Sequence, residues 1–193
     1  MVVFGFPLKR RIISLMTPFL KKPAKQKVYD LILVRGAPGA GKTTLGKRLR
    51  AHFPQGITIE VDSFKSMVNL LDWNDTTQYH HILEAVAMTC RSYLDNGYAP
   101  VIIIDTLSAE TLGDFMAILQ KFPPEPSCLI ITLVCDPDVL ELRIKGRKNG
   151  FSLIEPSLAI NDDMRKYRVF DEFLVDTTTS SPDDVLALVL ARI

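Results

Sequence analysis

Hydrophobic residues after position 27 alternate between two kinds of spacing along the chain. Short apolar runs, such as the four consecutive β-branched residues of 101–104, predict buried strands. Longer segments with apolar residues three or four positions apart predict helices. The predicted strands are 28–34, 57–61, 101–104, 128–134 and 173–175. The predicted helices are 42–52, 76–95, 109–121, 137–146, 156–169 and 181–193.

Apolar strands that alternate with helices indicate an α/β fold. We expect a mostly parallel five-stranded sheet with helices on both faces, because that arrangement buries both sides of each strand. The chain has 193 residues, 47% of them hydrophobic, which is enough for one such domain and too little for two. There is no apolar run of the roughly 20 residues that a membrane span needs.

The first 27 residues differ in charge from the rest of the chain. They contain seven Lys and Arg residues and no Asp or Glu, and their apolar residues gather on one side of a helical wheel. This pattern predicts a basic amphipathic extension that binds an anionic membrane surface or another polyanion. A disordered or misassigned start stays open as the alternative, because a short helix that contains Pro18 is marginal. The domain itself is predicted to span 28–193.

Overall charge and cysteine content add little about partners. The net charge of +1 neither favours nor opposes a polyanionic ligand. Cys90, Cys128 and Cys135 form no C-x-x-C pair, which indicates a cytoplasmic protein with reduced cysteines in its core.

The segment between the first predicted strand and the first predicted helix carries the most specific motif. It reads GAPGAGKT and matches G-x-x-x-x-G-K-[ST], a loop whose backbone N–H groups surround phosphate oxygens. Lys42 would place its charge on the β and γ phosphates, and Thr43 would offer its hydroxyl to Mg²⁺. We therefore predict binding of a nucleoside triphosphate, ATP, together with Mg²⁺. The predicted nucleotide site consists of Gly36, Ala37, Pro38, Gly39, Ala40, Gly41, Lys42, Thr43 and Thr44.

Two aspartates follow predicted strands, at the sheet edge where α/β proteins bind ligands. Asp62 can accept a proton from a substrate hydroxyl and orient it toward the γ-phosphate, and the alternative is an N-cap of the next helix. Asp105 ends a run of four apolar residues, the Walker-B pattern that places a carboxylate near Mg²⁺. Its alternative is an aspartate in a turn after the strand.

The segments LILVRGAPGAGKTTL, ITIEVDSF, VIIIDT, DPDVLELRIKGR and FLVDTT together resemble the small P-loop kinase-like NTPases, sometimes called AAA-type ATPases. This group includes chloramphenicol phosphotransferase, zeta toxin and relatives of polynucleotide kinase. The resemblance covers 28–193 and implies a three-layer P-loop sandwich that transfers a phosphoryl group, with Asp62 in the catalytic role. It also implies a lid whose arginines meet that group, which singles out Arg143 and Arg147.

The resemblance places further segments around the ligands. It sets Asp176 and Thr177 near the adenine, and 64–81 beside the phosphate acceptor. The cations at the end of the 137–146 helix have an alternative explanation, since the helix dipole alone favours them there.

Missing motifs narrow the class of P-loop protein. Without N-K-x-D or L-S-G-G-Q, a GTPase and an ABC ATPase are disfavoured, and the chain is too short for a helicase core or a AAA+ module with its helical lid domain. The sequence thus predicts an ATP- and Mg²⁺-dependent phosphotransferase that acts on a hydroxyl of a small molecule or nucleotide. An ATP-hydrolysing switch and a nucleotide-binding module without an acceptor are the alternatives.

Overall fold

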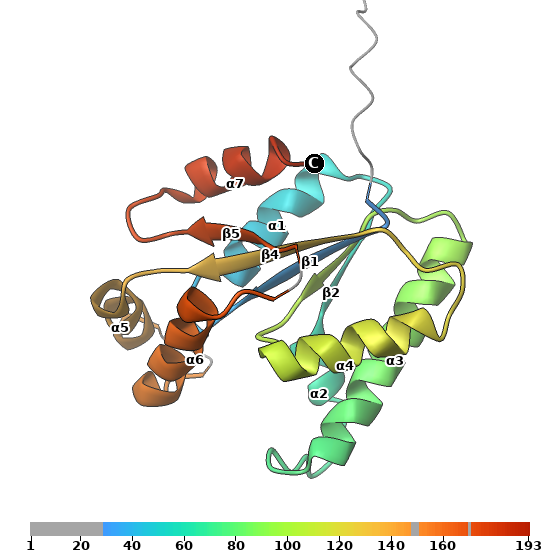
Figure 1. The fold of residues 1–193 in the computed structure, drawn as a ribbon, viewed down its shortest axis with the longest axis horizontal. Helices are drawn as coiled ribbons and strands as arrows, with labels where there is room; N and C mark the ends of the chain where they lie inside the picture. Colours follow the sequence, from blue (N-terminus) through green and yellow to red (C-terminus); the bar gives the residue numbers. More distant parts are fainter. Residues whose placement is uncertain (1–28, 148–150, 170) are drawn as a thin grey trace, which may run out of the picture.

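Five strands form one sheet at the centre of the molecule in the computed structural model, which describes residues 29–147, 151–169 and 171–193 (Figure 1). Every pair of neighbouring strands is parallel, and the order is β2-β3-β1-β4-β5. The strands are β1 (Leu31–Gly36), β2 (Ile57–Glu60), β3 (Val101–Ile104), β4 (Cys128–Val134) and β5 (Phe173–Asp176). The predicted parallel five-stranded sheet is confirmed.

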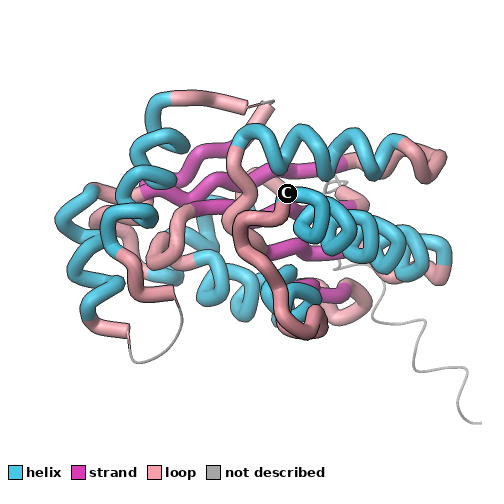
Figure 2. Tube along the Cα trace, turned by 90° about the horizontal axis from the view of Figure 1, so that it is seen from below, coloured by secondary structure: helices cyan, strands magenta, loops and turns pink. Residues whose placement is uncertain are grey.

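Helices cover both faces of this sheet, which the second view also shows (Figure 2). On one face Leu31 and Leu33 of β1 belong to a buried apolar cluster with residues of α3 and α4. On the other face Ile32 and Val34 pack in a cluster with α1 and α7. The helices are α1 (Lys42–His52), α2 (Val61–Lys65), α3 (Thr76–Asp95), α4 (Ala109–Gln120), α5 (Pro137–Lys145), α6 (Ile154–Lys166) and α7 (Pro182–Leu190). None of the described helices is long and apolar enough to cross a membrane.

The elements follow the predicted order, with shifted ends and one addition. The first strand runs to Gly36 rather than to residue 34, and the second ends at Glu60 because Val61 already begins α2. The apolar pattern does not predict α2, since a helix of five residues is too short to show a helical period. The predicted extension 1–27 lies outside the described residues, and its binding to an anionic surface stays a prediction.

All three cysteines are free, and the prediction that they lie in the core is confirmed. Cys90 and Cys135 are buried, and Cys128 is half-buried against the α3–α4 cluster. Burial raises the pKa of the Cys90 and Cys128 thiols to about 12, so both are protonated at neutral pH.

A buried ion pair anchors the end of β1, directly before the phosphate loop. The Arg35 guanidinium is 2.8 Å from a carboxylate oxygen of Glu172, and both side chains are 1% exposed. Arg35 also donates to the Thr132 hydroxyl at 2.8 Å and to the Leu107 carbonyl at 2.9 Å, and the Thr132 hydroxyl donates to Glu172. These contacts join β1 to β4, to the loop after β3 and to the segment before β5.

Arg35→Met should lower the free energy of unfolding by about 3–5 kcal/mol, because it leaves the Glu172 carboxylate buried without its partner. Urea unfolding followed by circular dichroism measures this. Arg48→Met is the matched control, since Arg48 pairs with Asp183 at the surface and the loss there should be about 0–1 kcal/mol. Equal losses of unfolding free energy in the two variants would show that the buried pair stabilises the protein no more than the surface pair does.

Candidate active site

The phosphate loop joins β1 to α1 and takes backbone conformations that favour glycine. Gly39 has a φ of 95°, and a Cβ atom there would lie 2.8 Å from the Leu140 side chain. Gly41 has a φ of 104° and is the N-cap of α1. Both conformations are costly for other residues, so these glycines determine the shape of the loop.

The N-terminus of α1 is built to receive an anion. Gly41 offers no side-chain cap, and the first turn of α1 contains no acidic residue. The first N–H groups of a helix have no partner within the helix and carry a partial positive charge. Phosphate oxygens are the natural ligands of such an uncapped helix start.

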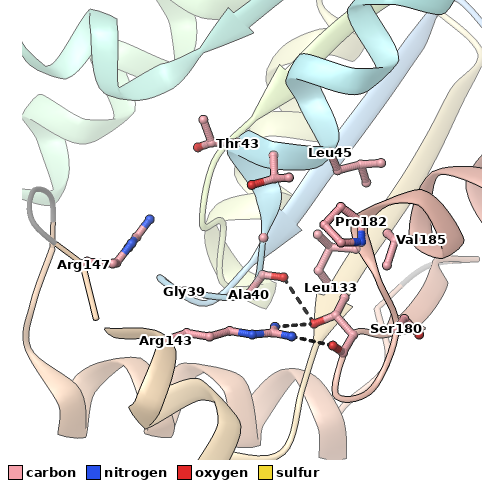
Figure 3. Close-up of a pocket in the computed structure, with 13 residues that line it drawn as sticks. Gly39, Ala40, Thr43, Leu45, Leu133, Arg143, Arg147, Ser180, Pro182 and Val185 are labelled. Atoms are coloured by element: carbon pink, nitrogen blue, oxygen red, sulfur yellow. Dashed lines mark hydrogen bonds between the residues drawn. The ribbon is translucent and has the colours of Figure 1, made fainter. Parts of the chain in front are cut away.

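A cavity of about 420 Å³ opens beside this helix start (Figure 3). Gly39, Gly41, Thr43 and Thr44 of the phosphate loop line it on one side. Apolar side chains also line it, namely Leu45, Leu133, Pro182 and Val185, together with the polar side chains of Arg143, Arg147, Thr177 and Ser180. A cavity with a polar phosphate end and an apolar end suits a nucleotide, whose base is flat and largely apolar.

Arg143 lies at the apolar end of this cavity. It points along the cavity toward Thr177 (Figure 3), donating to the Thr177 hydroxyl at 2.9 Å and to the Thr177 carbonyl at 2.7 Å. Thr177 follows directly after β5 and also lines the cavity. The structure thus places Arg143 with the predicted adenine segment.

Lys42 lies at the other end of the loop and is folded back onto it. Its ammonium group donates to the carbonyl oxygens of Gly36 at 2.7 Å and Ala37 at 3.1 Å, and it lies 3.4 Å from the Thr106 hydroxyl. Burial lowers the pKa of Lys42 to about 8, and the charges around it modify this effect. Asp105 and Asp62 raise the pKa of Lys42, whereas Arg147 and Lys65 lower it further.

Hydrogen bonds show which predicted residues come together. Lys65 donates to both Asp62 and Asp105, and the Lys42 ammonium lies 3.4 Å from the hydroxyl of Thr106, the residue after Asp105. Arg147 is exposed and lines the nucleotide cavity. The structure therefore brings Lys42, Asp62 and Asp105 close together beside the phosphate loop, whereas Arg143 is bonded to Thr177.

Both carboxylate oxygens of Asp105 are engaged by hydrogen-bond donors. Lys65 donates to Oδ1 at 2.7 Å, and the Tyr79 hydroxyl donates to Oδ2 at 2.7 Å. Lys65 also donates to Asp62 at 2.9 Å and so bridges the two carboxylates. Burial lowers the pKa of Lys65, but Asp105 and Asp62 together more than offset this, so the pKa lies above its usual value. Burial and Asp105 raise the pKa of Tyr79 well above its usual value, which keeps it a hydrogen-bond donor.

Asp62 occupies the second position of α2, and its side chain is 84% exposed. The N-cap of α2 is Glu60, so the alternative interpretation of Asp62 as an N-cap is wrong. The reason is that α2 begins at Val61, two residues earlier than a cap at Asp62 would require. The Asp62 carboxylate accepts a hydrogen bond from Lys65 through Oδ1 and is otherwise accessible from solvent.

Thr43 and Asp105 carry the oxygen atoms predicted to bind Mg²⁺. Asp105 is 4% exposed at the end of β3, and Thr43 lines the cavity in the first turn of α1. Mg²⁺ prefers such oxygen ligands and usually takes one or two from the protein, with phosphates and water completing its shell. These residues therefore fit Mg²⁺ bound with a nucleotide. Among the described residues, no three His, Cys, Asp or Glu side chains group to hold a metal by themselves.

The sequence pattern misses the role of Lys65. Its spacing of three residues from Asp62 is a signal, because residues three apart share one face of a helix. That signal depends on α2, which the apolar pattern does not predict. The contacts of Asp105 with Lys65 and Tyr79 are set by the tertiary fold, and no sequence motif predicts them.

Comparison with known proteins places the chain in a family. Residues 32–167, more than two thirds of the chain, match the family described as an AAA domain. The chain belongs to this family. A search of curated proteins found no match.

Solved structures of similar shape include small P-loop kinases and a resistance protein. A sugar kinase from Janibacter sp. HTCC2649 has a TM-score of 0.63 and 20% identity, covering 84% of this chain and 93% of its own. The tunicamycin resistance protein of Deinococcus radiodurans has a TM-score of 0.64 and 16% identity, covering 85% and 95%. A shikimate kinase from Acinetobacter baumannii has a TM-score of 0.59 and 16% identity, covering 86% and 93%. At these identities the likeness establishes the fold, which is that of the small P-loop kinases.

ATP binding should take up a proton as the pH rises through the pKa of Lys42, about 8. Above this pH, Lys42 of the nucleotide-free protein has lost its proton. The triphosphate binds the charged form, so Lys42 must take up a proton when ATP binds. ATP affinity should therefore fall by up to about tenfold per pH unit there. Isothermal titration in buffers of different ionisation enthalpy measures the proton uptake.

Lys47→Met is the matched control for this measurement, because Lys47 lies on the exposed side of α1. Proton uptake should persist in this variant and disappear in Lys42→Met, whose ATP binding should be severely weakened. Unchanged ATP affinity in folded Lys42→Met would exclude the phosphate-loop site.

Proposed function

We propose that the protein is an ATP- and Mg²⁺-dependent phosphotransferase that moves the γ-phosphoryl group to a hydroxyl of a small molecule. The observation that carries this proposal is that Asp62 and Asp105 share the Lys65 ammonium close to Lys42 of the phosphate loop, next to the cavity that Arg147 lines. A site for nucleotide binding alone needs no exposed carboxylate at that place. The fold of small P-loop kinases supports the same class of reaction.

The protein orients the nucleotide from both ends. The start of α1 and the Lys42 ammonium bind the β and γ phosphates, while the apolar end of the cavity holds the base. Arg143, fixed on Thr177, closes the cavity at the base end and serves as a positioning residue. Such fixation contributes to catalysis because phosphoryl transfer depends mainly on alignment and charge stabilisation.

The acceptor hydroxyl lies beside Asp62 in this proposal. Its oxygen forms a bond to the γ-phosphorus, the bond from that phosphorus to the β–γ bridging oxygen breaks, and ADP leaves. Asp62 accepts the hydroxyl proton. Arg147 compensates the negative charge of the transferring group. Mg²⁺ held by Thr43 and Asp105 would neutralise charge on the β and γ phosphates when it is bound.

An ATP-hydrolysing switch is the second candidate, and the exposure of Arg147 is the observation that favours it. An arginine that a partner protein could reposition is a familiar control of hydrolysis in P-loop proteins. Stimulation of ADP release by metabolites supports the phosphotransferase, and stimulation by a protein alone supports the switch.

Asp62→Asn should reduce metabolite-stimulated ADP release by about 10²-fold or more, because an amide cannot accept the proton. The variant should still fold and bind ATP. Coupled ADP detection with a cell metabolite extract measures the rate, and titration measures the affinity.

Asp162→Asn is the matched control for Asp62→Asn, since the exposed Asp162 also pairs with a lysine of its own helix. It should keep the wild-type rate. An unchanged rate in Asp62→Asn would remove this residue from the mechanism and favour the switch. Loss of ATP binding would instead place Asp62 in the metal shell.

Arg147→Ala should lower turnover far more than ATP affinity, by about 10³-fold if this arginine meets only the transition-state charge. Single-turnover kinetics separates the two effects. Lys145→Ala is the control, because Lys145 is exposed at the end of α5 and paired with Glu141. The proposed role fails if Arg147→Ala leaves both parameters at wild-type values.

A further inference from the structure

The side of the site that would receive the acceptor is poor in positive charge. The stretch 57–90 contains all of β2 and α2, the following loop and most of α3. It carries five carboxylates and one Lys or Arg, which is Lys65. Anionic substrates are ordinarily held by arginine or lysine side chains that are free to pair with them.

Lys65 is already committed to the protein. Its ammonium lies 2.7 Å from Asp105 and 2.9 Å from Asp62, and its side chain is 11% exposed. It also lies over the Tyr79 ring, 5.4 Å from the centroid. Two carboxylates share this one ammonium, so an anionic acceptor would have to take it from both of them.

Other cations of the neighbouring helices are paired away from the site. Arg91 on α3 contacts Asp95 and the Pro124 carbonyl. On α6, Arg165 pairs with Asp136 at 3.0 Å, and Lys166 pairs with Asp162. Arg147 faces the phosphate end, where the nucleotide itself supplies negative charge.

The loop between α2 and α3 on this side exposes three large apolar side chains. Met67, Leu70 and Trp73, in the loop between α2 and α3, are 71%, 97% and 77% exposed. Leu70 also has a φ of 60°, a left-handed conformation that is unfavourable for leucine. Such strain and exposure together are typical of functional loops.

We propose that the acceptor is a hydroxyl compound without negative charge, such as a neutral polyol or an amino alcohol. This inference rests on the proposed phosphotransferase function. An anionic acceptor would place its charge beside Asp62 and the triphosphate with no free cation from 57–90 to balance it. Like charges placed side by side repel one another, whereas a neutral or ammonium-bearing acceptor avoids this repulsion.

Charge fractionation of a metabolite extract tests this class. The extract is passed over a strong anion exchanger at neutral pH, and the retained anions are eluted and desalted. The wild-type protein then receives ATP with the flow-through, with the eluted anions or with both recombined. Transfer from γ-labelled ATP to new phosphate esters is measured, and Asp62→Asn in parallel controls for contaminating enzymes.

The flow-through should give at least about tenfold more labelled ester than the anion fraction, as expected for a discrimination of about 1.4 kcal/mol or more. The recombined fractions should match the flow-through, which shows that the anions do not merely inhibit. Ester formed mainly from the anion fraction overturns the inference and leaves the phosphotransferase standing. If no fraction yields ester, the proposed function fails and the inference fails with it.

Discussion

The common edge of the parallel sheet is the constraint on which the site depends. β1 pairs with β3 and β4 in register, so Val34 lies level with Ile104 on one side and with Ile131 on the other. The pairing continues past the strand end, since the Asp105 N–H donates to the Val34 carbonyl at 3.2 Å. Residues that directly follow the strands therefore meet at one edge, wherever they lie in the sequence.

Charge balance is the second organising feature at that edge. Lys42 and Lys65 are both withdrawn from solvent and bound to oxygen atoms of the protein. Asp105 is satisfied by Lys65 and Tyr79. A buried charge requires such partners. A nucleotide or metal that binds here must displace these internal contacts rather than enter a site of free charges. Burial of the Lys42 ammonium is what lowers its pKa.

Much of this arrangement follows from local sequence. The phosphate loop is a contiguous motif, and Asp62 and Asp105 stand next to apolar runs whose parallel pairing brings their ends together. Contacts between positions far apart in the sequence cannot be predicted from local sequence. Arg35 and Glu172 are 137 residues apart, and nothing near either of them predicts the partner. Arg143 and Arg147 have helical spacing in the sequence, but α5 ends at Lys145. Arg147 therefore lies outside the helix and lines the cavity, while Arg143 donates to Thr177.

The fate of the γ-phosphoryl group tests the central claim most directly. Wild-type protein, Mg²⁺, γ-labelled ATP and an unfractionated metabolite extract are incubated, and the label is followed by mass spectrometry. The account predicts that the label appears in a new phosphate ester, in an amount that matches the extra ADP formed. Label found only in inorganic phosphate, at a rate that the extract does not change, would contradict it.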